Sequence, residues 1–301
     1  MDKSEHPHYC LISEQFVSRK GLSIETVGAR MKHGWGIILL LLAWTSVPAL
    51  ADTLHINVYD GHRDYLLHSR SYSTAWDILR KAAAVQNITI EAHEAPWIRS
   101  ITFLRKSKGV NAVFGAMPSS KRRQWSQFSA PLAVEHIAAY TNVDKAIDSF
   151  SELMERKLDL NIGVTKGSIH QDIAKQLGFQ YVITFTKRES MFEMLKHRKI
   201  DALIYTHALT NFYCAKVFNV DDKDCVKQIG QPIENSTIHF MYRGEHDKTS
   251  ALAQRINAGV TELYVNGEIA RLFSEKGYRK ADYNFWQSRF LKWKNSETNS
   301  N

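Results

Sequence analysis

The sequence contains few of the residues that mark unusual classes of protein. Only 3 of its 301 residues are cysteine, 6 are proline and 15 are glycine. These low counts exclude a collagen-like, low-complexity or mostly disordered chain. The excess of charge of one sign is also small, because 39 basic and 31 acidic residues leave a net charge of +8. That excess favours acidic ligands only weakly.

The chain also lacks a long hydrophobic run. Its most apolar stretch, Gly34 to Trp44, is shorter than the roughly 20 residues that span a bilayer, so we expect no stable membrane insertion. A basic residue, Lys32, precedes the stretch and the small-residue sequence Ala49-Leu50-Ala51 follows it. This layout predicts a secretory signal peptide over residues 31–51 and a periplasmic location for the rest. The residue directly after the predicted cleavage site is Asp52 and not cysteine, which argues against a lipid anchor.

The 30 residues before Met31 show no pattern of their own. A signal peptide normally begins with its charged region, so we expect translation to start at Met31 and residues 1–30 to be dispensable or untranslated. Cys10 lies in this extension and then has no role. Cys214 and Cys225 remain, and an exported protein favours a local disulfide between them. The thirteen histidines form neither HExxH nor a paired Cys/His pattern, so the sequence predicts no metal site and no cofactor.

Hydrophobic periodicity predicts an α/β fold in which strands alternate with helices and pair mostly in parallel. At roughly 100 to 200 residues per domain, the length suggests about two compact units. In the first unit, strands are expected over 54–59, 88–91 and 111–114 and helices over 75–85 and 97–105. In the second, helices are expected over 150–157, 168–177 and 190–197 and strands over 161–165, 181–185 and 201–205. Ser149 and Glu152 fit a capping box at the first of these helices.

Two extended segments, 133–142 and 236–243, connect the units and indicate that the chain passes to the second unit and returns. We therefore expect residues 52–138 plus 242–301 to form lobe 1 and residues 139–241 to form lobe 2. Helices near 251–264 and 268–276 then complete lobe 1. The polar tail, 295–301, is expected to fray.

The segment Gly115 to Pro131 contains the strongest candidate for a binding site. Small hydroxyl residues, including Ser119, precede the basic turn Lys121-Arg122-Arg123 where a strand is expected to end. Backbone N–H groups, a hydroxyl and a guanidinium can converge there on one anion. A carboxylate suits this chemistry, because the planar guanidinium of arginine can donate to both of its oxygens.

This segment resembles the "G-M-T-x-T-x-x-R, then F-S-x-P" stretch of the extracellular solute-binding proteins, family 3, the amino-acid-binding components of ABC importers. Aligned on Phe128-Ser129, Arg122 occupies the position of the carboxylate-binding arginine and Ser119 that of an anchoring threonine. Further similarities are Pro96-Trp97-x-Arg99, Gly163 to Ser168 and Arg198 to Ala202, so the resemblance covers nearly all of 52–290. It implies a periplasmic-binding-protein-like (type II) fold, with two lobes joined by two hinge strands and a ligand cleft between them.

The resemblance and the expected strand ends select the candidate ligand-binding residues, because ligands of open α/β sheets bind beyond the carboxyl ends of strands. Trp97 is the candidate aromatic platform and is otherwise a core residue, and Arg122 is otherwise a surface ion-pair residue. Ser168 begins a helix, where it caps the helix and can also contact ligand. The remaining candidates are Tyr59, Asp60, Met117 and Thr206.

Thr206 is a departure from the family pattern. Amino-acid binders of family 3 usually have an aspartate there, which holds the ligand ammonium group. Without it, a free amino acid needs another acid, such as Asp60 or Asp64, or the ligand is a carboxylate without that amine. Asp201 is expected to cap a structural turn instead.

The sequence therefore predicts a monomeric periplasmic protein that binds a small carboxylate-bearing molecule, an amino acid or a related compound, with an ABC transporter permease as a further partner. It contains no catalytic motif and no nucleic-acid-binding patch. Two alternatives stay open: a dehydratase-type enzyme of the same fold, and a ligand sensor without a transporter. Acid–base candidates for the enzyme are Asp60, His62, Glu94 and His207.

Overall fold

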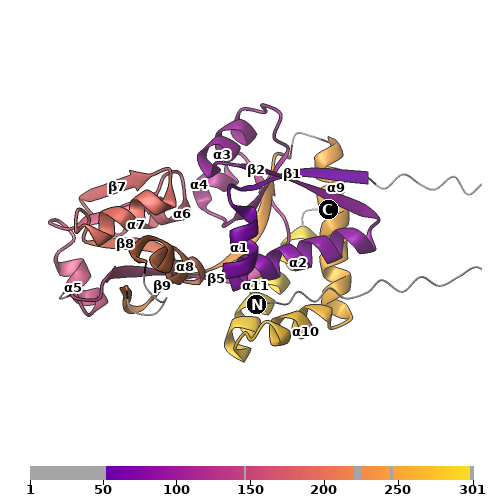
Figure 1. Cartoon of the computed structure of the whole chain (residues 1–301). Helices are drawn as coiled ribbons and strands as arrows, with labels where there is room; N and C mark the ends of the chain where they lie inside the picture. Colours follow the sequence, from indigo (N-terminus) through magenta and orange to yellow (C-terminus); the bar gives the residue numbers. More distant parts are fainter. Residues whose placement is uncertain (1–51, 146, 220–224, 245–246, 299–301) are drawn as a thin grey trace, which may run out of the picture. The chain divides into compact units, whose positions relative to one another are not determined.

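The computed structural model describes residues 52–145, 147–219, 225–244 and 247–298 (Figure 1). The predicted signal peptide, the extension before it and Cys10 lie outside the described residues. The fold is mixed α/β, as predicted, and nine strands of the described part form one hydrogen-bonded network.

The first lobe is built around the parallel strands β1 (Asp52–Tyr59), β2 (Ile88–Ala95) and β3 (Ala112–Ala116). Strand β1 alternates buried Leu54, Ile56 and Val58 with more exposed residues, so one face of the strand packs on the core. The helices that begin in this part of the chain are α1 (His62–His68), α2 (Arg70–Val85), α3 (Trp97–Arg105) and α4 (Ser120–Arg123).

The second lobe is built around the parallel strands β6 (Asn161–Thr165), β7 (Tyr181–Phe185) and β8 (Ala202–Thr206). Its helices are α5 (Phe150–Glu155), α6 (Ile169–Gln176), α7 (Arg188–Lys196) and α8 (His207–Phe218). Ser149 begins α5, where its hydroxyl accepts a hydrogen bond from the backbone N–H of Glu152 at 3.2 Å. Strand β8 is buried along its whole length, because protein covers both of its faces.

Two antiparallel strands, β5 (Ala133–Asn142) and β9 (Val226–Tyr242), connect the lobes. The long strand β9 pairs with β3 and with the short β4 (Gln127–Phe128) near Met241, and β5 pairs with β8 near Ala139. Ala133 pairs with Ile238 and Asn142 with Val226, so the two strands run side by side over the whole length of β5. This arrangement is the predicted two-lobed fold with two hinge strands. The predicted residue limits of the lobes stay a prediction.

The C-terminal helices α9 (Asp247–Val265), α10 (Glu268–Glu275) and α11 (Lys280–Thr298) follow β9. Helix α11 was not predicted and extends through most of the tail that was expected to fray. It is ordered because Trp286 and Phe290 are fully buried, and the indole N–H of Trp286 donates to the carbonyl of Pro131 at 3.1 Å. Helices α1 and α8 were also missed by the sequence analysis. The extended segment predicted over 236–243 is part of β9, which begins ten residues earlier, at Val226.

No helix among the described residues is long and apolar enough to cross a lipid bilayer. The structure joins Cys214 to Cys225, with their Cα atoms 5.9 Å apart. This bond ties α8 to the segment that leads into β9.

Helices α2 and α9 pack against each other at a close backbone approach. A Cβ atom placed on Gly259 of α9 would lie 2.2 Å from the backbone carbonyl oxygen of Ala82 in α2. The absence of a side chain at position 259 therefore sets how closely the two helices can approach.

Replacing Gly259 with alanine is expected to destabilise the protein by about 1–3 kcal/mol, because the added methyl group forces the helices apart. Urea unfolding measures the change. Gln254→Ala, an exposed substitution on the same helix, is the control and should leave stability almost unchanged. Equal stability of Gly259→Ala and the unmodified protein would contradict this account of the packing.

Candidate functional site

One cavity collects side chains from both lobes and from the two connecting strands. It holds about 550 Å³ of space, part of it open to solvent. The first lobe contributes Tyr59, Tyr65, Ser69, Tyr72, Trp97, Gly115, Met117 and Arg122. The second contributes Thr165, Ser168, Ile169, His170, Arg188, Tyr205, Thr206 and Leu209. Glu135 of β5 and Ile238 of β9 complete the lining.

Arg122 is buried, with 5% of its surface exposed. It lies in the short helix α4, and Ser119 caps that helix: the Ser119 hydroxyl accepts a hydrogen bond from the Arg122 backbone N–H at 3.3 Å. One guanidinium nitrogen, Nη1, donates to the carbonyl of Met117 at 2.7 Å. The other, Nη2, donates to the carbonyl of Gly167 in the second lobe at 3.0 Å. The guanidinium has further N–H donors that remain for a ligand.

Trp97 strengthens this contact between the lobes. Its indole N–H donates to the same Gly167 carbonyl at 3.2 Å, and the Arg122 guanidinium lies 5.3 Å from the centre of its ring. A cation this close to an aromatic face is stabilised electrostatically. Burial lowers the pKa of Arg122 from its usual value. The Trp97 ring, the Arg122 guanidinium and the Gly167 carbonyl therefore contact one another at the wall of the cavity.

A second guanidinium, that of Arg188, enters the cavity from the second lobe. Arg188 is the first residue of α7 and is 8% exposed. Its guanidinium carbon lies 4.8 Å from the ring centre of Tyr59 and 5.1 Å from that of Tyr65, both in the first lobe. Asp60 is its ion-pair partner at 3.6 Å, a separation longer than a hydrogen bond. Two cations, one from each lobe, therefore line the same space.

Tyrosine rings form much of the wall near these cations. The ring centre of Tyr59 lies 4.9 Å from that of Tyr65 and 5.5 Å from that of Tyr72. The Tyr59 hydroxyl donates to the carbonyl of Gly115 at 2.8 Å. Gly115 has φ of +81°, and a Cβ there would lie 3.0 Å from the Tyr59 ring. Glycine at position 115 therefore gives the Tyr59 ring the room that it occupies.

Three buried polar side chains of the lining have no hydrogen-bond partner for their side-chain atoms within the described residues. They are the hydroxyls of Thr165 and Thr206 and both ring nitrogens of His170. Thr165 ends β6, Thr206 ends β8 and His170 lies in the first turn of α6. Burial, followed by the charges of Arg188 and Arg122, lowers the pKa of His170 to about 3. The ring is therefore neutral at pH 7 and offers one donor and one acceptor.

Glu135 is the carboxyl group among the lining residues. It is 5% exposed, the hydroxyl of Ser71 donates to it at 2.6 Å, and the backbone N–H of His136 donates to it at 3.0 Å. Both hydrogen bonds favour the ionised form, but burial outweighs them and raises the pKa of Glu135 to about 7. The group can therefore hold or release a proton near neutral pH.

Six of the predicted ligand-binding residues line the cavity together: Tyr59, Trp97, Met117, Arg122, Ser168 and Thr206. The other two lie outside the lining. Ser119 holds the beginning of α4 instead, and Asp60 is half-exposed and pairs with Arg188. The Ser168 hydroxyl donates to the carbonyl of Thr165 at 2.7 Å, so it closes the turn before α6.

The acid–base candidates of the sequence are also outside the lining. His62 contacts the hydroxyl of Tyr72, His207 contacts that of Tyr140, and Glu94 accepts a hydrogen bond from the backbone of Gly61. The acidic and basic side chains of the lining that sequence reasoning missed are Glu135, His170 and Arg188. Arg188 follows the end of β7 by three residues, so the strand-end rule that selected Tyr59 also points to it. No local sequence pattern identifies Glu135, on the connecting strand β5, as a residue of the cavity.

No family model matches the sequence, and no curated protein matches it. Solved structures do resemble it. The ligand-binding core of GluR0 from Nostoc punctiforme, in complex with L-glutamate, has a TM-score of 0.59 and 17% identity. The match covers 75% of this chain and 100% of that one.

Two further structures match over similar lengths. An ancestral arginine-binding protein bound to arginine has a TM-score of 0.58 and 18% identity, covering 76% of this chain and 99% of its own. A histidine kinase sensor domain with similarity to periplasmic binding proteins has a TM-score of 0.59 and 14% identity, covering 76% and 97%. At these identities the similarity establishes the fold, which is that of two-lobed periplasmic binding proteins.

The raised pKa of Glu135 predicts a stability change with a definite sign. The folded protein holds this proton up to about pH 7, whereas the unfolded chain releases it near pH 4.5. Stability from this group is therefore complete below pH 4.5 and is lost as the pH rises to 7. Glu135→Gln mimics the protonated acid, so the stability of the unmodified protein relative to this variant should fall by up to ~3 kcal/mol over that range.

Urea unfolding of both proteins at several pH values measures this difference. Other titrating groups, including buried His170, are present in both proteins, so the difference isolates position 135. A difference in stability that does not change with pH would contradict the raised pKa.

Proposed function

We propose that this protein is a periplasmic solute-binding protein of the family 3 type, which captures a small carboxylate-bearing ligand between its lobes. The observation that carries the proposal is the buried guanidinium of Arg122 at the wall of the cavity between the lobes. A buried cation that still has N–H donors is best satisfied by a carboxylate, which can accept two parallel hydrogen bonds from it. The hydroxyls of Thr165 and Thr206 and the ring of His170 supply further hydrogen bonds.

The charges of the lining narrow the class of ligand. Two arginines face the cavity, and the one lining carboxyl group, Glu135, has a pKa raised to about 7 by burial. Thr206 occupies the place where related amino-acid binders have an aspartate for the ligand ammonium. An acid with a second anionic group, and without a free amine, matches this arrangement better than a simple amino acid does. In this proposal Arg122 binds one acidic group and Arg188 the other.

The proposed setting is the periplasm, with the loaded protein delivering its ligand to an ABC importer. A sensor role is the second candidate, and the similarity in fold to a histidine kinase sensor domain favours it. Both roles need the same capture of ligand by the two lobes. An enzyme remains a third candidate because Glu135 has a pKa suited to proton transfer. Turnover of prephenate-like acids, measured on the purified protein, separates the enzyme from the two binding roles.

Arg122→Ala is expected to abolish binding of small acids such as glutarate, because it removes the guanidinium that binds one of the two acidic groups in this proposal. Isothermal titration calorimetry, with thermal shift as a second readout, measures the loss. Arg122→Lys should also bind poorly, since an ammonium group cannot reproduce the planar donor pair.

Arg123→Ala is the matched control, because the neighbouring Arg123 is exposed. It should bind as the unmodified protein does. Circular dichroism and the melting temperature without ligand verify that the Arg122 variants fold. Unchanged affinity in a folded Arg122→Ala protein would remove the proposed site.

Arg188→Met tests the class of ligand. It should lower the affinity for glutarate at least about tenfold and leave the affinity for butyrate almost unchanged, because only the dicarboxylate has a group for the second cation. The two affinities are measured by calorimetry in the same buffer. Lys187→Met, which changes an exposed neighbour, is the control. An equal loss for both acids would mean that Arg188 supports the fold of the site and does not select its ligand.

A further inference from the structure

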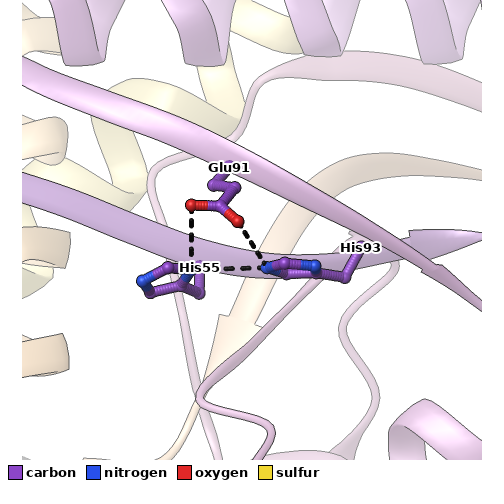
Figure 2. Close-up of side chains that lie close together, drawn as sticks. All are labelled: His55, Glu91 and His93. Carbon is purple, nitrogen blue, oxygen red and sulfur yellow. Dashed lines mark hydrogen bonds and ion pairs between the residues drawn. The ribbon is translucent and has the colours of Figure 1, made fainter.

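A cluster of two histidines and a glutamate lies on the exposed face of the first lobe's sheet, outside the cavity. It consists of His55 on β1 and of Glu91 and His93 on β2. Their side chains are 56%, 52% and 50% exposed. Figure 2 shows the Glu91 carboxylate with one oxygen directed at each imidazole ring. None of the three residues lines the ligand cavity.

The sheet brings the three side chains together. His55 and Glu91 are register partners on neighbouring parallel strands. His93 follows Glu91 by two residues, so both side chains leave β2 on the same face. The positions are therefore held by the backbone hydrogen bonds of the sheet and need no ordering of a loop.

The distances within the trio match the separation of two ligands bound to one metal ion. His55 Nδ1 lies 3.3 Å from His93 Nε2 and 3.4 Å from Glu91 Oε2, and His93 Nε2 lies 3.4 Å from Glu91 Oε1. Ordinary N–H···O hydrogen bonds measure about 2.7–3.2 Å. Ligands at about 2.0–2.1 Å from a tetrahedral Zn²⁺ lie about 3.3–3.4 Å from one another. The two imidazole nitrogens therefore have the separation of two zinc ligands, and each lies at a similar distance from one of the two Glu91 oxygens.

The chemistry of the donors agrees with this geometry. Two imidazoles and a carboxylate form a donor set that binds zinc, with a fourth position left for water or another ligand. Within the described residues, the ion pairs of His55, Glu91 and His93 are confined to the trio. In the part of the chain that the structure describes, Glu91 forms no ion pair with a lysine or an arginine.

We propose that His55, Glu91 and His93 form a binding site for Zn²⁺ or a similar divalent transition metal, with a solvent-facing fourth position. The proposal is independent of the ligand cavity and of the function assigned to it. His55 and His93 are separated by 38 positions in the sequence numbering, which explains why no short sequence pattern indicates the site.

Calorimetric titration with ZnCl₂ tests the site on protein purified without a polyhistidine tag. The unmodified protein should bind one equivalent of zinc at this site. His55→Ala, His93→Ala and Glu91→Gln should each weaken that binding at least about tenfold, because each removes one of three ligands. Replacing zinc with Co²⁺ should give the visible absorption of four-coordinate cobalt in the unmodified protein and not in His93→Ala.

His197→Ala is the matched control, because His197 is exposed and lies 3.4 Å from the carboxylate of Glu193. It should bind zinc as the unmodified protein does. The substituted side chains are exposed, and circular dichroism verifies that the variants keep their fold. The proposal would be overturned if the unmodified protein showed no saturable zinc binding. It would also be overturned if His55→Ala and His93→Ala bound zinc as tightly as the unmodified protein does.

Discussion

Arg122 carries its charge at a position that solvent barely reaches, and the arrangement of the cavity depends on how that charge is stabilised. Removing a guanidinium from water costs several kcal/mol unless polar groups replace the lost hydration. Here the carbonyls of Met117 and Gly167 accept its hydrogen bonds, and the ring of Trp97 lies beside it. Because Gly167 belongs to the second lobe, the hydrogen bonds that its carbonyl accepts from Arg122 and Trp97 also hold the lobes together around the cavity.

The second cation gives the cavity its chemical character. Arg188 lies against the rings of Tyr59 and Tyr65 and has only a long contact to the half-exposed Asp60. Glu135 does not fully offset the two arginines, since burial favours its neutral form near pH 7. A net positive cavity of this kind favours anions over zwitterions. Thr206, which has a hydroxyl in place of a carboxylate, contributes to the same preference.

The secondary structure near the site was largely predictable, and the exceptions have physical reasons. Strands β6 and β7 are short apolar runs at the predicted positions, and helix α6 has one apolar stripe through Ile169 and Ile173. Helix α8 was missed because its more exposed face mixes apolar residues such as Ala208, Phe212 and Ala215 with polar ones, so the sequence shows no polar stripe of helical period. Helix α11 was missed because its sequence is polar, and it is ordered by two buried aromatic residues, Trp286 and Phe290.

The sequence by itself determined the α/β fold class, the two connecting strands and the segment around Arg122, because these depend on local periodicity and on residues close together in the chain. Only the tertiary structure decided which distant groups meet. It placed Arg188 and Glu135 in the same cavity as Arg122, and it brought His55 to Glu91 and His93 across two strands. Contacts between residues that are distant in the sequence depend on strand register and on the packing of the lobes, which no local stretch of sequence specifies.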